Sequence, residues 1–369
     1  MKKFLLFIIT VLGLSLFVSC GKTDKNNNKN NNVEEPKTYE LIADNHFKQG
    51  FTVSPANKTT SPDTRWPLAY DFKYLDKTQQ TVWQVGQHGC YYGLADHYWN
   101  NEKEIEYKDG YYIIEDESKA IKVNPDTGSL IMELNASKEY DHPRKDKEEW
   151  PHILFQESFT KQPLIKDLES LKLSMNVLMH KSEMHMTTEE YNPSLHTIQY
   201  IMYIYVYSNA ALDAGQYMFF GIPIYDYRYK VMRENGLIDA GTAGNTGNFI
   251  YQMSTLDYLP NGLTVGQEEH IEIDLIQSIS NALILAQTFG KLANSTINDL
   301  YITSMNIGFE IPGTFDCSIE LSGLSLIASE KNWRYWLRRR NYEKTNKKNI
   351  DDFNFMYTFS TFYKGNEES

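Results

Sequence analysis

Cysteine is scarce in this chain: its 369 residues contain only Cys20, Cys90 and Cys317. No cysteine and histidine cluster has the spacing of a zinc site, and the nine histidines are scattered over separate segments. We therefore expect no structural zinc, no other bound metal and no cofactor. Should Cys20 be modified, two cysteines remain, and in an exported compartment they form either a Cys90–Cys317 disulfide or two buried free thiols.

A basic surface is also lacking. Lys and Arg number 36 against 48 Asp and Glu, so the formal net charge is −12, and no sustained basic face offsets it. Nucleic acid is therefore not expected as a partner. Aromatic residues are abundant instead, at 14% of the chain with 26 tyrosines. Side chains with an apolar face and a polar tip suit half-buried sheet surfaces and platforms for sugars.

The N-terminus carries an apolar run, Phe4 to Phe17, directly after Met1-Lys2-Lys3. This run is too short to span a bilayer as a stable helix and has the form of a signal peptide. Val18-Ser19-Cys20-Gly21 follows it and resembles the lipobox of bacterial lipoproteins. The resemblance implies that residues 1–19 are removed and that Cys20 is acylated, which anchors the protein to the cell envelope.

Residues 20–38 follow as a flexible tether, because 21–32 are almost entirely Asn and Lys without any apolar residue. We expect the anchor to lie in the outer membrane, with the folded part on its periplasmic face or on the cell surface. At the other end, residues 331–369 form a basic, aromatic tail. This tail either lies on an anionic membrane or is an appendage without a role.

Residues 39–330 read as one β domain, because apolar and polar residues alternate with period two between Gly, Pro, Asn and Asp. No helix alternates with these runs, so they predict an all-β sandwich of two sheets. One short helix is predicted over 276–289, where apolar residues recur at helical spacing before Gly290. The ten predicted strands are 110–115, 129–134, 153–159, 171–179, 196–207, 216–225, 250–254, 270–275, 301–310 and 316–321.

The run 196–207 shows how the alternation predicts a binding face. Met202, Ile204 and Val206 share one side and should form the core, while Tyr203 and Tyr205 project from the other. The same split recurs in neighbouring runs. If those strands share one sheet, its open face carries the following predicted ligand-binding residues: Trp150, His152, Gln156, Asn176, Gln199, Tyr203, Tyr205 and Tyr217.

The strand pattern, the Trp150–His152 segment and the terminal 306–310 and 318–327 runs resemble the concanavalin-A-like jelly roll of legume lectins, glucanases and alginate-lyase-type enzymes. The resemblance implies a jelly-roll sandwich with a concave face for a polysaccharide or oligosaccharide. No catalytic motif is complete. Glu272 and Asp274 alternate like glucanase acids but lack the surrounding aromatic pattern, and a solvated strand face is the simpler interpretation.

Lyases of the alginate type use Gln, His, Arg and Tyr, for which Gln156, Gln199, His152, His196 and Arg144 are candidates. The Gln-x-His strand signature is absent. Glycan capture is therefore the preferred function, with a polysaccharide lyase or glycoside hydrolase as the first alternative and a structural envelope protein as the second. Residues 139–150 and 239–248 are the expected functional loops, and Asp226 with Arg228 either binds a charged sugar substituent or forms an internal ion pair.

Overall fold

The computed structural model describes residues 36–56, 69–99, 102–240 and 246–332. The signal peptide, Cys20, most of the tether and the tail beyond residue 332 lie outside the described residues. No helix in the described part is both long and apolar enough to cross a membrane.

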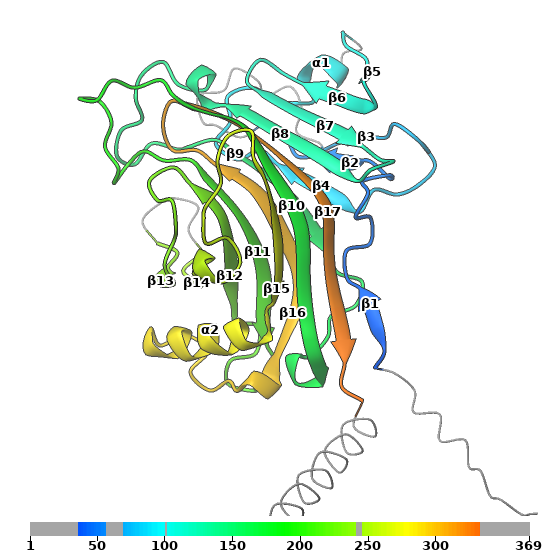
Figure 1. Ribbon diagram of the computed structural model, residues 1–369, viewed down its shortest axis with the longest axis vertical. Helices are drawn as coiled ribbons and strands as arrows, with labels where there is room; N and C mark the ends of the chain where they lie inside the picture. The colour runs from blue at the N-terminus through cyan, green and yellow to red at the C-terminus, as the bar shows by residue number, and fades with distance from the viewer. Residues whose placement is uncertain (1–35, 57–68, 100–101, 241–245, 333–369) are drawn as a thin grey trace, which may run out of the picture. The chain divides into compact units, whose positions relative to one another are not determined.

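Two β-sheets face each other (Figure 1). The first, called the β10 sheet, has the strand order β15 (Glu268–Asp274), β10 (Leu168–Met184), β17 (Phe315–Glu330), β8 (Ser129–Asn135), β7 (Lys119–Asn124), β6 (Tyr111–Glu115) and β5 (Glu106–Lys108), with β1 (Thr38–Glu40) pairing with β17. The second, called the β11 sheet, has the order β13 (Asn235–Ile238), β14 (Phe249–Gln252), β12 (Tyr217–Asp226), β11 (Gln199–Ser208), β16 (Leu300–Glu310), β9 (His152–Ser158), β4 (Trp83–Gly86), β2 (Phe51–Val53) and β3 (Tyr70–Phe72).

The predicted fold class, an all-β jelly-roll sandwich of two sheets, is confirmed. The chain passes from one sheet to the other along β9, β10 and β11, and again along β15, β16 and β17, with antiparallel pairing throughout these strands. All ten predicted strands are present. The structure adds seven strands that the sequence did not predict, β1 to β5, β7 and β13, and the single helical turn α1 (Asp96–Trp99).

The core lies between the sheets because each long strand buries one side. In β11, Met202, Ile204 and Val206 are buried, whereas Tyr203 and Tyr205 on the opposite side are half-buried. In β10, the apolar residues from Leu171 to Val177 fill the same core from the other sheet. Burying each such side chain stabilises the fold by about 1.5–3 kcal/mol.

The predicted helix is confirmed as α2 (Ile276–Thr288). Its buried residues are Ile279, Ala282, Leu283 and Ala286, which fall on one face. Gly290 ends it with a φ of +69°, and the Gly290 and Lys291 N–H groups donate to the carbonyls of Gln287 and Ala286 at 3.0 Å each. This is a Schellman motif, which satisfies the last carbonyls of a helix and favours glycine at this position.

Cys90 and Cys317 are both free and buried, so the disulfide alternative is wrong and the two-thiol alternative holds. The Cys90 thiol donates to the His152 carbonyl oxygen at 3.3 Å, and burial raises its pKa to about 12. Cys317 lies on the core side of β17, and burial raises its pKa as well.

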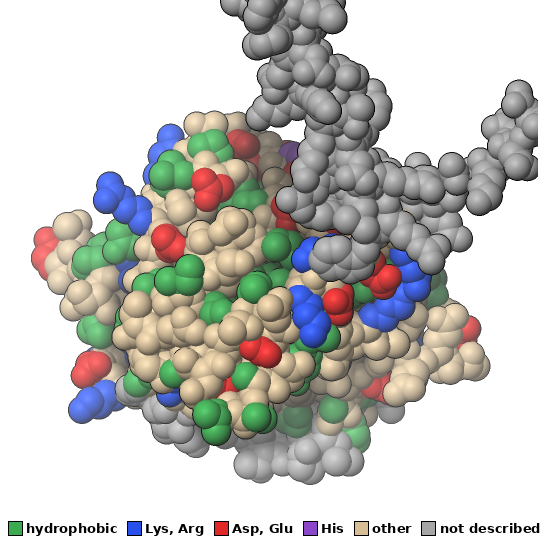
Figure 2. Space-filling model, turned by 90° about the horizontal axis from the view of Figure 1, so that it is seen from below, with side chains coloured by type: hydrophobic (Ala, Val, Ile, Leu, Met, Phe, Trp, Pro, Cys, Tyr) green, Lys and Arg blue, Asp and Glu red, His purple; other side chains and the backbone are tan. Residues whose placement is uncertain are grey.

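Figure 2 shows the molecule from below the view of Figure 1. On this face, the charged side chains of both signs are interspersed among polar and hydrophobic ones. Single exposed apolar residues of this kind are normal for a folded protein and mark no site by themselves.

Candidate ligand-binding site

A groove of about 1510 Å³ lies on the face of the β11 sheet that is turned away from the core. Its floor is formed by β9, β11 and β16, one wall by β12 to β14, and the other wall by residues 88–92 and 138–150. The predicted functional loop 139–150 therefore borders the groove. Of the second predicted loop, Asp239 and Ala240 line it, and residues 241–245 are outside the described part.

Strand register brings the floor residues together in two rows. Glu310 of β16 lies between Gln199 of β11 and His152 of β9. Four residues along β16, Asn306 is paired with Tyr203 on one side and with Gln156 on the other. Because cross-strand neighbours lie only about 4.5–5.5 Å apart at Cβ, each row presents its polar groups as one cluster.

An ion pair sits at the centre of the first row. The His152 Nε2 atom is 3.3 Å from a Glu310 carboxylate oxygen, and the Trp150 indole N–H donates to the same oxygen at 3.2 Å. Burial opposes charge on both groups, yet their mutual attraction lowers the pKa of Glu310 and raises that of His152. Burial and the nearby His152 lower the pKa of His88, which lies beside this pair. The pKa shifts thus favour a charged Glu310–His152 pair on the floor and a neutral imidazole of His88 next to it.

Trp150 links this pair to the wall above it. Its ring stacks on His152 with centroids 5.6 Å apart and also contacts the Arg144 guanidinium at 4.7 Å. Arg144 is buried and donates to the Glu148 carbonyl oxygen at 2.9 Å. The indole ring therefore packs the 138–150 loop against the floor of the groove.

Tyr203 and Tyr205 give the floor its aromatic surface. Both phenol rings are half-buried, and burial raises the pKa of both hydroxyls, so they stay protonated at neutral pH. The Asn306 amide donates to the Tyr205 hydroxyl at 3.1 Å and the Gln252 amide to the Tyr203 hydroxyl at 3.4 Å. These bonds fix the two rings on the floor, and aromatic rings beside polar side chains suit a ligand with both apolar faces and hydroxyls.

Five predicted residues line the groove together: Trp150, His152, Gln199, Tyr203 and Tyr205. Gln156 is exposed on the same sheet but does not line the groove, and Tyr217 stacks on Tyr205 beyond it, with ring centroids 5.8 Å apart. Asn176 does not join them. It belongs to β10 in the other sheet, where it accepts a hydrogen bond from His270 at 2.7 Å. The expectation that all these strands share one sheet is wrong for Asn176, because β10 pairs with β15 and β17.

The other candidate residues are either exposed on a strand or already bonded to partners within the protein. Glu272 and Asp274 lie exposed on β15 in the β10 sheet, which agrees with the simpler interpretation of a solvated strand face. His196 is buried and bonds the Arg144 carbonyl oxygen through Nε2 at 2.7 Å. Arg228 forms an ion pair with Asp226 at 2.6 Å, so the internal-pair alternative holds for these two residues.

Three groove residues were not predicted as site residues: Glu310, Asn306 and His88. The first two had a usable signal: in β16 they alternate with the buried Met305, Ile307 and Phe309, so period-two phase places them on the open face. His88 follows the four-residue strand β4, which is too short to show any alternation.

No family model matches the sequence, and no curated protein matches it. Solved structures resemble it in fold. One is a cellulase derived from Cel12A of Rhodothermus marinus, with 13% sequence identity, coverage of 60% of this chain and 92% of that chain, and a TM-score of 0.34. A family 12 xyloglucanase from Bacillus licheniformis has 12% identity, coverage of 61% of this chain and 97% of that chain, and a TM-score of 0.35. The family 11 xylanase from Neocallimastix patriciarum has 11% identity, coverage of 61% of this chain and 94% of that chain, and a TM-score of 0.32. Likeness at this level concerns the architecture alone.

Proposed function

We propose that the protein is a lipid-anchored envelope protein that binds a polysaccharide in the groove of the β11 sheet. The observation that carries the proposal is the floor, where the half-buried rings of Tyr203 and Tyr205 lie beside amides from three strands. Sugar rings stack their C–H faces on such aromatic surfaces, and neighbouring amides and phenols bond the hydroxyls.

The charges around the groove favour a neutral glycan. Six carboxylates line it, from Glu139, Asp141, Glu148, Glu149, Asp239 and Glu310, against three Lys and Arg side chains, from Lys138, Lys147 and Arg228. Arg228 is already paired with Asp226, just as Glu139 is with Lys119 and Glu310 with His152, which leaves four carboxylates against Lys138 and Lys147. A uronate chain would therefore meet net repulsion, and this weighs against the lyase alternative, which needs its substrate carboxylates neutralised.

Tyr203→Ala should weaken polysaccharide binding by about 1–3 kcal/mol, as expected for one lost stacking ring, while the fold survives. Isothermal titration against a panel of neutral and uronate-containing polysaccharides measures the loss and identifies the class. Tyr107→Ala is the matched control, because Tyr107 is an exposed tyrosine on β5 of the other sheet. Equal affinity of the Tyr203→Ala variant and the unaltered protein would contradict the proposal.

One observation favours cleavage as a second candidate. Glu310 is a carboxylate on the groove floor with a histidine at 3.3 Å, and such a pair can move a proton. A glycosidase, however, uses two carboxylates about 5–10 Å apart, and among the described strand residues that line the groove Glu310 is the single carboxylate. Binding without new reducing or unsaturated ends supports the capture function. New ends that disappear in Glu310→Gln support the enzyme.

The envelope anchor rests on the lipobox-like segment at Cys20. Cys20→Ala should leave the chain without lipid and move it from the membrane fraction to the supernatant, because the thioether-linked acyl chains at Cys20 together supply the attachment. Fractionation followed by detergent partitioning measures this. Ser19→Ala keeps the cysteine and serves as the control, and unchanged partitioning of Cys20→Ala would exclude the anchor.

A further inference from the structure

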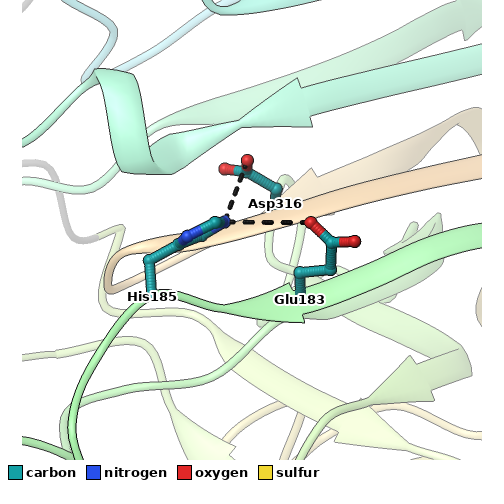
Figure 3. Close-up of side chains that lie close together, drawn as sticks. All are labelled: Glu183, His185 and Asp316. Atoms are coloured by element: carbon teal, nitrogen blue, oxygen red, sulfur yellow. Dashed lines mark ion pairs between the residues drawn. The ribbon is translucent and has the colours of Figure 1, made fainter.

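The three side chains of Glu183, His185 and Asp316 meet on the β10 sheet, on the side away from the core (Figure 3). Glu183 ends β10 together with Met184, His185 follows directly, and Asp316 lies opposite Glu183 in β17. The His185 Nε2 atom is 3.1 Å from an Asp316 carboxylate oxygen and 4.0 Å from a Glu183 carboxylate oxygen. We propose that this cluster is a binding site for a divalent transition-metal ion of the zinc class.

Convergence on one nitrogen distinguishes this cluster from the other histidine–carboxylate contacts in the described residues. His97 and His142 each touch two carboxylates, but through opposite ring nitrogens, so their acids point to different places. His180 meets one carboxylate, from Glu320 at 2.9 Å. Only at His185 does the same Nε2 atom face both acids, as the two dashed lines in Figure 3 show.

The spacing suits a small ion. Bonds of about 2.0–2.2 Å in a tetrahedral arrangement separate the ligand atoms by roughly 3.3 Å. The His185–Asp316 separation is already close to this value, and the Glu183 side chain, 61% exposed, has room to approach. Two carboxylates balance a divalent charge, and an imidazole ligand favours zinc over calcium or magnesium, which prefer oxygen shells.

A second observation points to a ligand at the same place. Thr314 is buried, and its hydroxyl has no hydrogen-bond partner within the part of the chain that the structure describes. The His185 N–H donates to the Thr314 carbonyl oxygen at 2.8 Å, which places the Thr314 backbone beside His185, two residues before Asp316. A buried hydroxyl without a partner is destabilising, and a metal-bound water at the open fourth position that reaches it would supply the missing hydrogen bond.

The Asp316 carboxylate is also held in position by a backbone hydrogen bond. The Ser137 N–H donates to its Oδ1 atom at 3.2 Å, so Oδ2 is the oxygen that faces His185. A backbone donor behind a ligand orients it and raises metal affinity. A bound ion would fasten the end of β10 to the start of β17, the two longest strands.

Titration of the full chain in detergent with ZnCl2, after chelation and dialysis, tests the site. We expect one zinc per chain, and an affinity at least about tenfold lower in His185→Gln and in Glu183→Gln, since even indirect partners of a metal typically contribute 10–100-fold. Both side chains are exposed, so circular dichroism should show an intact fold. His180→Gln is the matched control and should bind zinc as the unaltered chain does.

Three results would overturn the proposal: no saturable zinc binding, unchanged affinity in both His185→Gln and Glu183→Gln, or an equal loss in His180→Gln. Parallel titrations with CaCl2 and MgCl2 decide the ion class. Binding of either at least about tenfold weaker than zinc supports the assignment, and equal binding contradicts it. None of these outcomes depends on glycan binding, because the cluster belongs to the β10 sheet and the groove to the β11 sheet.

Discussion

Replacing Lys119 by Met should lower the free energy of unfolding by about 3–5 kcal/mol, the usual cost of removing one partner from a buried ion pair. The Lys119 side chain is fully buried, with its ammonium 2.8 Å from Asp116 and 3.1 Å from Glu139. Without it, two carboxylates stay in a site that is closed to water. Neither can be solvated there, and each would have to take up a proton or force the structure open.

Lys103→Met is the matched control for this prediction. Lys103 pairs with Glu115 at 2.8 Å, but the two side chains are 40% and 43% exposed. Exposed pairs contribute about 0–1 kcal/mol, so this variant should unfold almost as the unaltered chain does. Urea denaturation of both variants measures the difference, and equal losses would mean that the buried Lys119 pair contributes no more to stability than the exposed Lys103 pair.

The buried Lys119 cluster also supports the groove. Its ammonium donates to the Tyr92 carbonyl oxygen at 2.8 Å, and the Tyr91 N–H donates to Glu139. Both tyrosines and Glu139 line the groove wall. The substitution should therefore loosen this wall as well as destabilise the fold.

The long strands could be predicted from the sequence because each of them must bury one side. In β11 the aliphatic residues specify which side faces the core, and that specification placed Tyr203 and Tyr205 correctly on the open side. Strand phase does not specify which strands are neighbours. Asn176 has the right phase within β10, but hydrogen bonding to β15 and β17 puts it in the other sheet.

The remaining features depend on tertiary pairing. Strands such as β2 and β13 have three or four residues, which is too short for a period to be recognised. Glu183 and Asp316 are distant in sequence, so no spacing rule for metal ligands applies to them. The burial of Lys119 depends on a distant partner as well: Asp116 is only three residues away, but Glu139 comes from a separate loop.

Glu157 makes the stability of the fold depend on pH. It lies on the core side of β9 and is only 1% exposed, although it is a carboxylic acid. One oxygen accepts the Ala43 N–H at 2.6 Å, and the other has no hydrogen-bond partner among the described residues. Burial raises its pKa to about 7, and the carboxylates of Asp44 and Glu40 add to the effect.

Because the pKa is higher in the folded state than the usual value of about 4.3, the folded chain binds this proton more tightly than the unfolded chain does. The stabilisation is complete below about pH 4 and is lost as the pH rises through 7, with a total of about 3–4 kcal/mol at roughly 1.4 kcal/mol per pKa unit. Glu157→Gln cannot ionise, so its free energy of unfolding should exceed that of the unaltered chain increasingly between pH 5 and pH 8. Urea denaturation across this range measures the gap, with the exposed Glu268→Gln as control. Parallel pH profiles for the unaltered chain and Glu157→Gln would show that Glu157 does not titrate in this window.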